Sequence, residues 1–239
     1  MFYGTDTIFQ CIGCGNLVAR PTLLSGSDNG KLVYSDTNVW TPMMPKYPQV
    51  VICRKCGSVL WLNKMEGFSS IEWEKTYQNT DSEKKQFMEF LNIKEYFSIL
   101  ENIENLTTED EIFIRTCIIW EYNDRVRTEK EQSESIPYLL NRKYHGHERV
   151  RTEEEQFESV SDKLLWSENV ECLKKLLHNK EDDWKVLLAD LYRYTLDFEI
   201  SHEIITSIVN PEYEWIKPQF EEEIRKKNGI VFQLISNVE

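Results

Sequence analysis

The spacing of apolar residues changes near residue 66 and divides the chain into two parts. Before that point, apolar residues form short runs rich in β-branched side chains, of which residues 50–52 (Val-Val-Ile) and 59–62 (Val-Leu-Trp-Leu) are the clearest. Residues 17–19 and 31–34 have the same character. Such runs, separated by glycine and proline, predict short strands. We therefore expect a small β-rich domain over residues 1–66.

From residue 67 onward, apolar residues recur every three or four positions, which is the spacing of amphipathic helices. Thr108 and Glu111 have the spacing of a capping box at a helix start. Asn210-Pro211 predicts another start, residues 226–229 a helix end, and Pro218 a kink or break between them. The apolar stripes behind these predictions are Phe87, Phe90, Leu91, Phe97, Leu100 and Ile103; Ile112, Cys117, Ile118 and Trp120; Leu164, Leu165, Leu173, Leu176 and Leu177; and Leu187, Leu188, Leu191 and Tyr192.

Two matched cysteine motifs lie in the β-rich part. Residues 11–15 read Cys-Ile-Gly-Cys-Gly and residues 53–57 read Cys-Arg-Lys-Cys-Gly. Two cysteines in a C-x2-C spacing can turn their sulfurs toward one point, and two such pairs complete a tetrahedron. We therefore predict that Cys11, Cys14, Cys53 and Cys56 bind one Zn²⁺ ion. The 38 residues between the pairs exceed the usual ribbon spacing of about 15–20, so we expect an inserted loop.

Four sulfur ligands leave no open position for water or substrate, so the predicted zinc is structural and not catalytic. Iron is the alternative metal, because sulfur ligation alone does not separate the two ions. A dithiol redox pair is a second alternative. The predicted fold class is thus α+β, with an N-terminal zinc ribbon followed by an acidic, mostly α-helical domain over residues 67–239.

The helical part contains two further patterns. Residues 187–200 resemble the turn of a tetratricopeptide helix pair, although any helical hairpin gives this pattern. The segment from Arg125 to Gln132 returns 24 residues later, from Arg149 to Gln156. Two copies do not make a solenoid. We interpret them as a local duplication that forms exposed charged helix, and a binding surface of alternating charge is the alternative.

Charge is distributed unevenly between the two parts. The net charge is −13, and residues 1–65, with six basic and three acidic residues, carry +3, so the rest carries −16. An acidic body repels phosphate backbones, so nucleic-acid binding would depend on the N-terminal part. No apolar run approaches the ~18–20 residues of a membrane span. The first residues, Met-Phe-Tyr-Gly-Thr-Asp, show no basic region followed by a long apolar stretch, so we expect no secretory signal among them. We expect a cytoplasmic protein without a membrane partner.

The remaining candidate residues favour structural roles. We expect Cys117 and Cys172 to be core residues. His145 and His147 are predicted in a surface loop and His178 and His202 in helices, and no familiar catalytic motif is present. Trp40, Trp61 and Trp73 are expected to pack between ribbon and helices, with an aromatic binding face as the alternative.

The N-terminal residues resemble an uncharacterised group of bacterial proteins. The resemblance covers residues 8–62 and rests on the cysteine pairs with Gly15, then Ser25-Gly26, Ser35-Asp36, Pro42-Met43, Pro45, Pro48 and Trp61. It implies a long-insert zinc ribbon before a tetratricopeptide-like helical region, and it implies no activity.

These observations lead to three functional hypotheses. The first is a non-enzymatic adaptor that binds a protein partner. The second is a nucleic-acid-binding zinc ribbon, since Arg54 and Lys55 lie inside a cysteine pair. The third is an enzyme that uses a groove between ribbon and helices. The sequence leaves the partner and the oligomeric state open.

Overall fold

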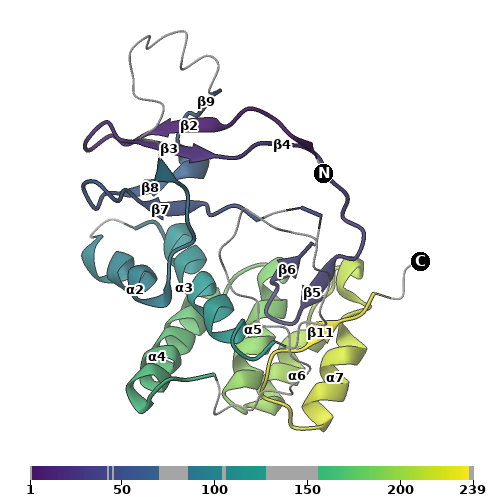
Figure 1. Ribbon diagram of the computed structural model, residues 1–239. Coiled ribbons are helices and arrows are strands. Elements are labelled where there is room, and N and C mark those ends of the chain that lie inside the picture. Colours follow the sequence, from purple (N-terminus) through teal and green to yellow (C-terminus); the bar gives the residue numbers. More distant parts are fainter. Residues whose placement is uncertain are drawn as a thin grey trace. The chain divides into compact units, whose positions relative to one another are not determined.

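The computed structural model describes residues 2–41, 43–44, 46–69, 86–103, 106–127 and 156–236. Contacts group the chain into two compact units, Met1–Lys31 with Thr41–Asn102 and Leu32–Trp40 with Ile103–Glu239. The first consists mainly of strands and the second mainly of helices, in agreement with the α+β class (Figure 1). The boundary expected after residue 66 falls inside the first unit. That residues 1–66 fold as a domain of their own stays a prediction.

Two antiparallel hairpins carry the cysteine motifs of the first unit. β2 (Thr7–Gln10) pairs with β3 (Leu17–Arg20), and β7 (Val50–Ile52) pairs with β8 (Val59–Trp61). On the first hairpin, β9 (Phe68–Ser69) pairs with β2, and β10 (Gln86–Phe87) runs parallel to β3. Among the described residues, the first unit also contains β1 (Phe2–Tyr3), which pairs with β4 (Leu23–Ser25), η1 (Leu62–Lys64) and α2 (Ile93–Asn102).

The hairpins form one small core around the cysteines. Phe9, Val18, Val51, Leu60 and Leu62 are buried in it together with Cys11 and Cys53. The strands predicted at residues 17–19, 50–52 and 59–62 are confirmed, except that Leu62 begins η1. A core of this size contributes little stability on its own, so an ion at its centre would supply a large share.

Helix α2 starts later than the apolar spacing predicts. Phe87 lies in β10 and is 57% exposed, so the prediction of a helix at this residue is wrong. The start is set by Asn92 and Glu95, because each side chain accepts a hydrogen bond from the other's backbone amide. This reciprocal capping leaves the helix to begin at Ile93.

The second unit combines a three-stranded sheet with helices that each pack against the next along the chain. The sheet has the order β11-β5-β6, with β5 (Leu32–Tyr34), β6 (Val39–Trp40) and β11 (Gln233–Leu234). The helices in the described part of this unit are α3 (Thr108–Asn123), α4 (Val160–Leu177), α5 (Asp182–Tyr194), α6 (Phe198–Thr206), η4 (Pro211–Tyr213) and α7 (Lys217–Arg225). The α5–α6 hairpin is confirmed, and its tetratricopeptide character stays a prediction.

Several helix ends differ by a few residues from the expected positions. The N-cap of α3 is Thr107, whose side chain accepts from the Asp110 amide, so the capping box predicted at Thr108 is wrong by one residue. Asn210 caps the helix start at Pro211 as expected, but the helix is a short 3₁₀ turn. Pro218 lies in the first turn of α7, where its missing N–H costs nothing, and thereby separates η4 from α7.

The predicted apolar stripe of α4 is only partly buried. Leu173 and Leu177 are buried, whereas Leu164 is 59% and Leu165 42% exposed. One buried hydrophobic cluster of the second unit lies further along the chain, where α5, α6 and α7 meet β11. Its buried members are Val186, Ala189, Ile205, Ile208, Ile216, Phe220 and Leu234.

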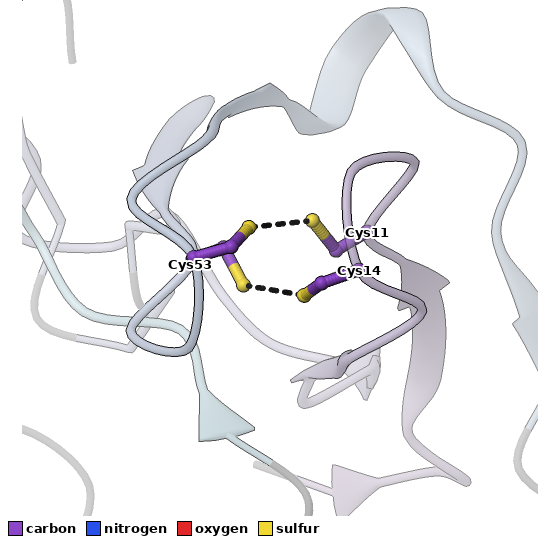
Figure 2. Close-up of side chains that lie close together, drawn as sticks. Cys11, Cys14 and Cys53 are labelled. Atoms are coloured by element: carbon purple, nitrogen blue, oxygen red, sulfur yellow. Dashed lines mark hydrogen bonds between the residues drawn. The ribbon is translucent and has the colours of Figure 1, made fainter.

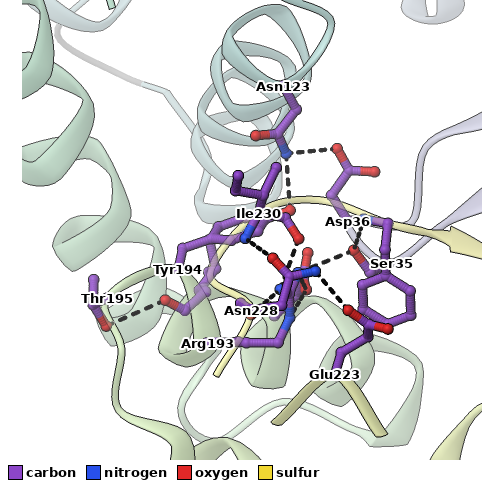
Figure 3. Close-up of polar contacts among 12 residues, drawn as sticks. Ser35, Asp36, Asn123, Arg193, Tyr194, Thr195, Glu223, Asn228 and Ile230 are labelled. Carbon is purple, nitrogen blue, oxygen red and sulfur yellow. Dashed lines mark hydrogen bonds and ion pairs between the residues drawn. The ribbon is translucent and has the colours of Figure 1, made fainter. Parts of the chain in front are cut away.

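A buried polar network fixes the β5–β6 turn to the helices (Figure 3). The Asp36 carboxylate accepts hydrogen bonds from Asn123 Nδ2 at 2.8 Å and from the Arg127 guanidinium. Ser35 Oγ accepts from Arg193, which also forms an ion pair with Asp190 at 2.6 Å. All of these polar side chains are buried and matched by a partner of complementary charge or hydrogen-bonding type. Residues 32–40 therefore belong to the helical unit.

The repeated segment from Arg125 to Gln132 and from Arg149 to Gln156 lies mostly outside the described residues. Its described ends contradict the interpretation as exposed charged helix. Arg127 is buried outside any helix, and Gln156 is buried and donates through Nε2 to Asn123 Oδ1 at 2.9 Å. Arg125 donates to the Gln156 carbonyl at 3.0 Å. The two described ends are thus joined to each other by hydrogen bonds.

Arg125 and Tyr122 also hold the start of α4. Arg125 pairs with Asp162 at 2.8 Å, and the Tyr122 hydroxyl donates to the same carboxylate at 2.6 Å. Burial raises the pKa of Asp162, but hydrogen bonds from Tyr122, the Glu158 amide and Arg125 outweigh it and hold the pKa below its usual value.

Candidate metal centre

The two cysteine motifs adopt the same backbone conformation at the tips of their hairpins. We call residues 11–16 the first knuckle and residues 53–58 the second knuckle. In the first, the Gly15 amide donates to the Cys11 carbonyl at 2.8 Å, and in the second the Gly57 amide donates to the Cys53 carbonyl at 2.8 Å. Gly15 and Gly57 have φ of +71° and +77°. This left-handed conformation explains why each motif continues with glycine.

The four cysteine sulfurs form one cluster, in which all Sγ atoms lie within 4.8 Å of one another. Figure 2 shows Cys11 and Cys14 on the first knuckle facing Cys53 on the second. The sulfurs of Cys11 and Cys56 are 3.6 Å apart, as are those of Cys14 and Cys53. A tetrahedral Zn–S site with bonds of about 2.3 Å has sulfur–sulfur edges of about 3.8 Å. The donor set and its spacing therefore fit one tetrahedral metal ion.

Hydrogen bonds to the sulfurs favour the negative form that a metal ligand needs. The Ser58 hydroxyl, 3.1 Å from Cys56 Sγ, and the Ser58 amide lower the pKa of Cys56 to about 6. Burial raises the pKa of Cys53, but the amides of Cys56 and Lys55 outweigh it and hold that pKa below its usual value. The cluster therefore contains a thiolate near neutral pH.

Cys14 behaves in the opposite way. The Asn16 amide lowers the pKa of Cys14, but burial and the three neighbouring sulfurs together raise it to about 12. One thiol thus keeps its proton while four sulfurs share a small volume. A divalent cation would replace that proton, so binding releases protons and becomes weaker as pH falls.

The site is half enclosed by the protein. Cys11 and Cys53 are at most 1% exposed, Cys14 is intermediate and Cys56 is exposed. On the second knuckle, Arg54 forms ion pairs with Glu95 at 2.5 Å and with Glu89 at 3.1 Å. The approach to the cluster therefore lies on the side of Cys56.

Of the candidate residues that the structure describes, only the four cysteines form this cluster. Cys117 is buried in α3, as expected, whereas Cys172 in α4 is only partly buried. His178 caps the end of α4 and His202 lies in α6, while His145 and His147 lie outside the described residues. Trp40 belongs to β6 of the second unit and Trp61 to β8 of the first, and Trp73 is not among the described residues.

Three polar residues around the cysteines were not predicted from the sequence. Asn16 and Ser58 occupy the same position in the two knuckles, directly after the glycine, and this shared position is a signal that the sequence contains. Gln86 contacts both knuckles from β10. No local pattern marks Gln86, because its contacts depend on the pairing of β10 with β3.

None of the helices in the described ranges combines the length and apolar character that a bilayer crossing requires. Comparisons of the sequence with models of protein families, with curated proteins and with solved structures found no match. The resemblance to a bacterial group with a zinc ribbon and tetratricopeptide-like helices therefore stays a prediction. The coarser part of this resemblance is supported by the structure alone: four clustered cysteines that could hold a metal ion lie at the tips of two hairpins, in a strand-rich region that precedes a helical region.

Proposed function

We propose that Cys11, Cys14, Cys53 and Cys56 bind one structural Zn²⁺ ion, and that the chain is a non-enzymatic adaptor for a protein partner. The observation that carries the proposal is the closed set of four sulfurs within 4.8 Å. Four protein ligands satisfy tetrahedral zinc completely. The ion then stabilises the two hairpins and takes no part in turnover.

Zinc is preferred to iron for a physical reason. Both ions accept four thiolates. Zinc has no redox chemistry, so a zinc site with an exposed ligand such as Cys56 keeps its charge in a reducing compartment. An iron site of this kind would make the purified protein coloured and redox-active, which distinguishes the two ions directly.

Protein binding is preferred to nucleic-acid binding because of the charges around the second knuckle. Arg54, one of the two basic residues in it, is paired with two glutamates. The chain as a whole carries −13, which opposes the approach of a phosphate backbone. The third hypothesis, an enzyme with a groove between ribbon and helices, stays a prediction.

Metal analysis of the full-length chain tests the proposed centre. We would purify it under reducing conditions without metal-affinity resin and measure zinc and iron by mass spectrometry. We expect one zinc per chain, and less than a tenth of that in Cys11→Ser/Cys53→Ser. A Cys117→Ser variant is the control and retains the zinc. Iron in place of zinc, or a metal content unchanged by the double substitution, contradicts the proposal.

A binding experiment tests the adaptor role. The immobilised wild-type chain and the Cys11→Ser/Cys53→Ser variant would be exposed to native extract, and each recovered protein would be recombined with the purified chain. A partner that binds wild type in the purified system supports the proposal. Failure to find one, together with salt-sensitive binding of DNA or RNA in anisotropy titrations, favours the nucleic-acid alternative.

A further inference from the structure

Gln86 connects the two knuckles although it lies 30 residues beyond Cys56. Its Oε1 atom accepts a hydrogen bond from Asn16 Nδ2 in the first knuckle at 3.3 Å and from the Arg54 amide in the second at 2.8 Å. Its Nε2 atom donates to the Ile52 carbonyl at 3.0 Å, just before Cys53. One side-chain amide is therefore bonded to both halves of the sulfur cluster.

Asn16 extends this connection to a sulfur. Its Nδ2 atom lies 3.7 Å from Cys53 Sγ, on the opposite knuckle, as well as 3.3 Å from Gln86 Oε1. Because Gln86 Oε1 can only accept, it turns the NH₂ group of Asn16, and not its oxygen, toward the cluster. An N–H aimed at Cys53 stabilises a thiolate, whereas an oxygen in the same place would repel it.

The Arg54 amide shows a second effect of Gln86. Within the second knuckle, the amides of Lys55 and Cys56 donate to Cys53 Sγ. The amide of Arg54, which lies between Cys53 and Lys55 in the sequence, donates to Gln86 Oε1 instead. Gln86 thus accepts from an amide of the knuckle that donates to none of the sulfurs, and this hydrogen bond holds the knuckle against β10.

The position of Gln86 is set by strand pairing and not by the ribbon sequence. β10 runs parallel to β3 with Gln86 opposite Val18, and Asn16 directly precedes β3. Phe87, the next residue of β10, pairs opposite Ala19 and is 57% exposed. The two residues of this strand therefore share their backbone environment but differ in their contacts with the cysteine cluster.

We propose that Gln86 is a positioning residue of the metal centre, which holds the two knuckles in register and orients Asn16 toward Cys53. This inference rests on the proposed function, since it concerns the same ion. Metal retention then depends on a strand outside residues 1–66. Polar partners of metal ligands typically change metal affinity by about 10–100-fold when they are removed, and we expect a loss in that range.

Gln86→Met tests the inference in the full-length chain, because methionine keeps the length of the side chain and removes its hydrogen bonds. Phe87→Ala is the matched control on the same strand. Zinc affinity would be measured by competition with a chromophoric chelator, and Co²⁺ would be added as a spectroscopic probe of the sulfur geometry. Circular dichroism and urea titration would report on the fold.

We expect Gln86→Met to lose zinc affinity about 10–100-fold and to shift the Co²⁺ ligand-field bands, while Phe87→Ala stays within about threefold of wild type. Asn16→Ala is the second variant and should reproduce both changes even if Gln86→Met folds poorly. Combining the two substitutions should cost little more than either alone, because both break the same connection.

A folded Gln86→Met chain with wild-type zinc affinity and an unchanged Co²⁺ spectrum overturns the role of Gln86 and leaves the zinc proposal standing. A wild-type chain that binds neither Zn²⁺ nor Co²⁺ overturns both. If Gln86→Met and Phe87→Ala lose zinc affinity equally and the Co²⁺ spectrum is unchanged, Gln86 only stabilises β10. This result also overturns the inference.

Discussion

The buried ion pair between Asp36 and Arg127 leads to a stability prediction of large magnitude. The Asp36 side chain is fully buried and that of Arg127 is 3% exposed. Asp36→Ala leaves the guanidinium buried without its main counter-charge, and breaking a buried pair in this way costs about 3–5 kcal/mol. Since whole domains unfold with only about 5–15 kcal/mol, this loss is a large fraction of the total.

A second carboxylate moderates the effect. Asp124 also pairs with Arg127, and its side chain is 29% exposed. Burial lowers the pKa of Arg127, but the charges of Asp36 and Asp124 outweigh it and hold that pKa above its usual value. Because one counter-charge remains, we expect a loss near the lower end, about 3 kcal/mol.

Urea titration of the full-length chain, followed by circular dichroism and tryptophan fluorescence, measures this loss. Asp28→Ala, at an exposed aspartate, is the matched control and should stay within about 0.5 kcal/mol. Asp36→Leu/Arg127→Met replaces both charges by apolar side chains and should recover most of the stability. A loss below about 1 kcal/mol for Asp36→Ala, or a double variant whose loss equals the sum of the two single losses, would show that the pair contributes little to stability.

Three further predictions concern the helical unit, and each uses urea titration as its measurement. Thr107→Ala should cost about 1 kcal/mol by removing the N-cap of α3, while Thr108→Ala next to it should cost much less; equal costs would place the cap elsewhere. Leu173→Ala should cost about 2–5 kcal/mol because Leu173 is fully buried, whereas Leu164→Ala, at a 59% exposed position of the same helix, should cost about 0.5 kcal/mol or less. Asp162 has a lowered pKa, so it contributes stability above the carboxyl pKa of the unfolded chain, about 3.9, and this is lost as pH falls through the folded value. Asp162→Asn should therefore flatten the fall in stability below about pH 4, and an unchanged pH profile would contradict that role.

The strands and helices were largely predictable because their signals are local. The runs at residues 50–52 and 59–62 became β7 and β8, and Asn210-Pro211 became a helix start. The failures occurred where a partner distant in sequence decides the outcome. The run at residues 31–34 did become β5, but its place in the helical unit depends on Asp36, whose partner Asn123 lies 87 residues away. Apolar spacing contains no information about such pairings.

In the candidate site, too, the features with local sequence signals were predictable and those that depend on distant partners were not. The C-x2-C-G motifs identify the four clustered cysteines because ligand spacing and the left-handed glycine are both local requirements. The nucleic-acid hypothesis depends on Arg54 and Lys55 inside the second cysteine pair, but the structure pairs Arg54 with Glu89 and Glu95. No local sequence pattern marks Gln86, because its contacts with the knuckles depend on the pairing of β10 with β3.

X-ray absorption at the zinc edge, recorded on the reduced chain, distinguishes a zinc ion with four sulfur ligands from any other metal site. We expect one zinc per chain with four sulfur neighbours at about 2.3 Å and no lighter ligand. Substituting Cys56 by serine should replace one of these sulfurs by an oxygen or nitrogen scatterer. A wild-type spectrum with fewer than four sulfurs, or a chain that retains no metal when its thiols are fully reduced, would contradict it.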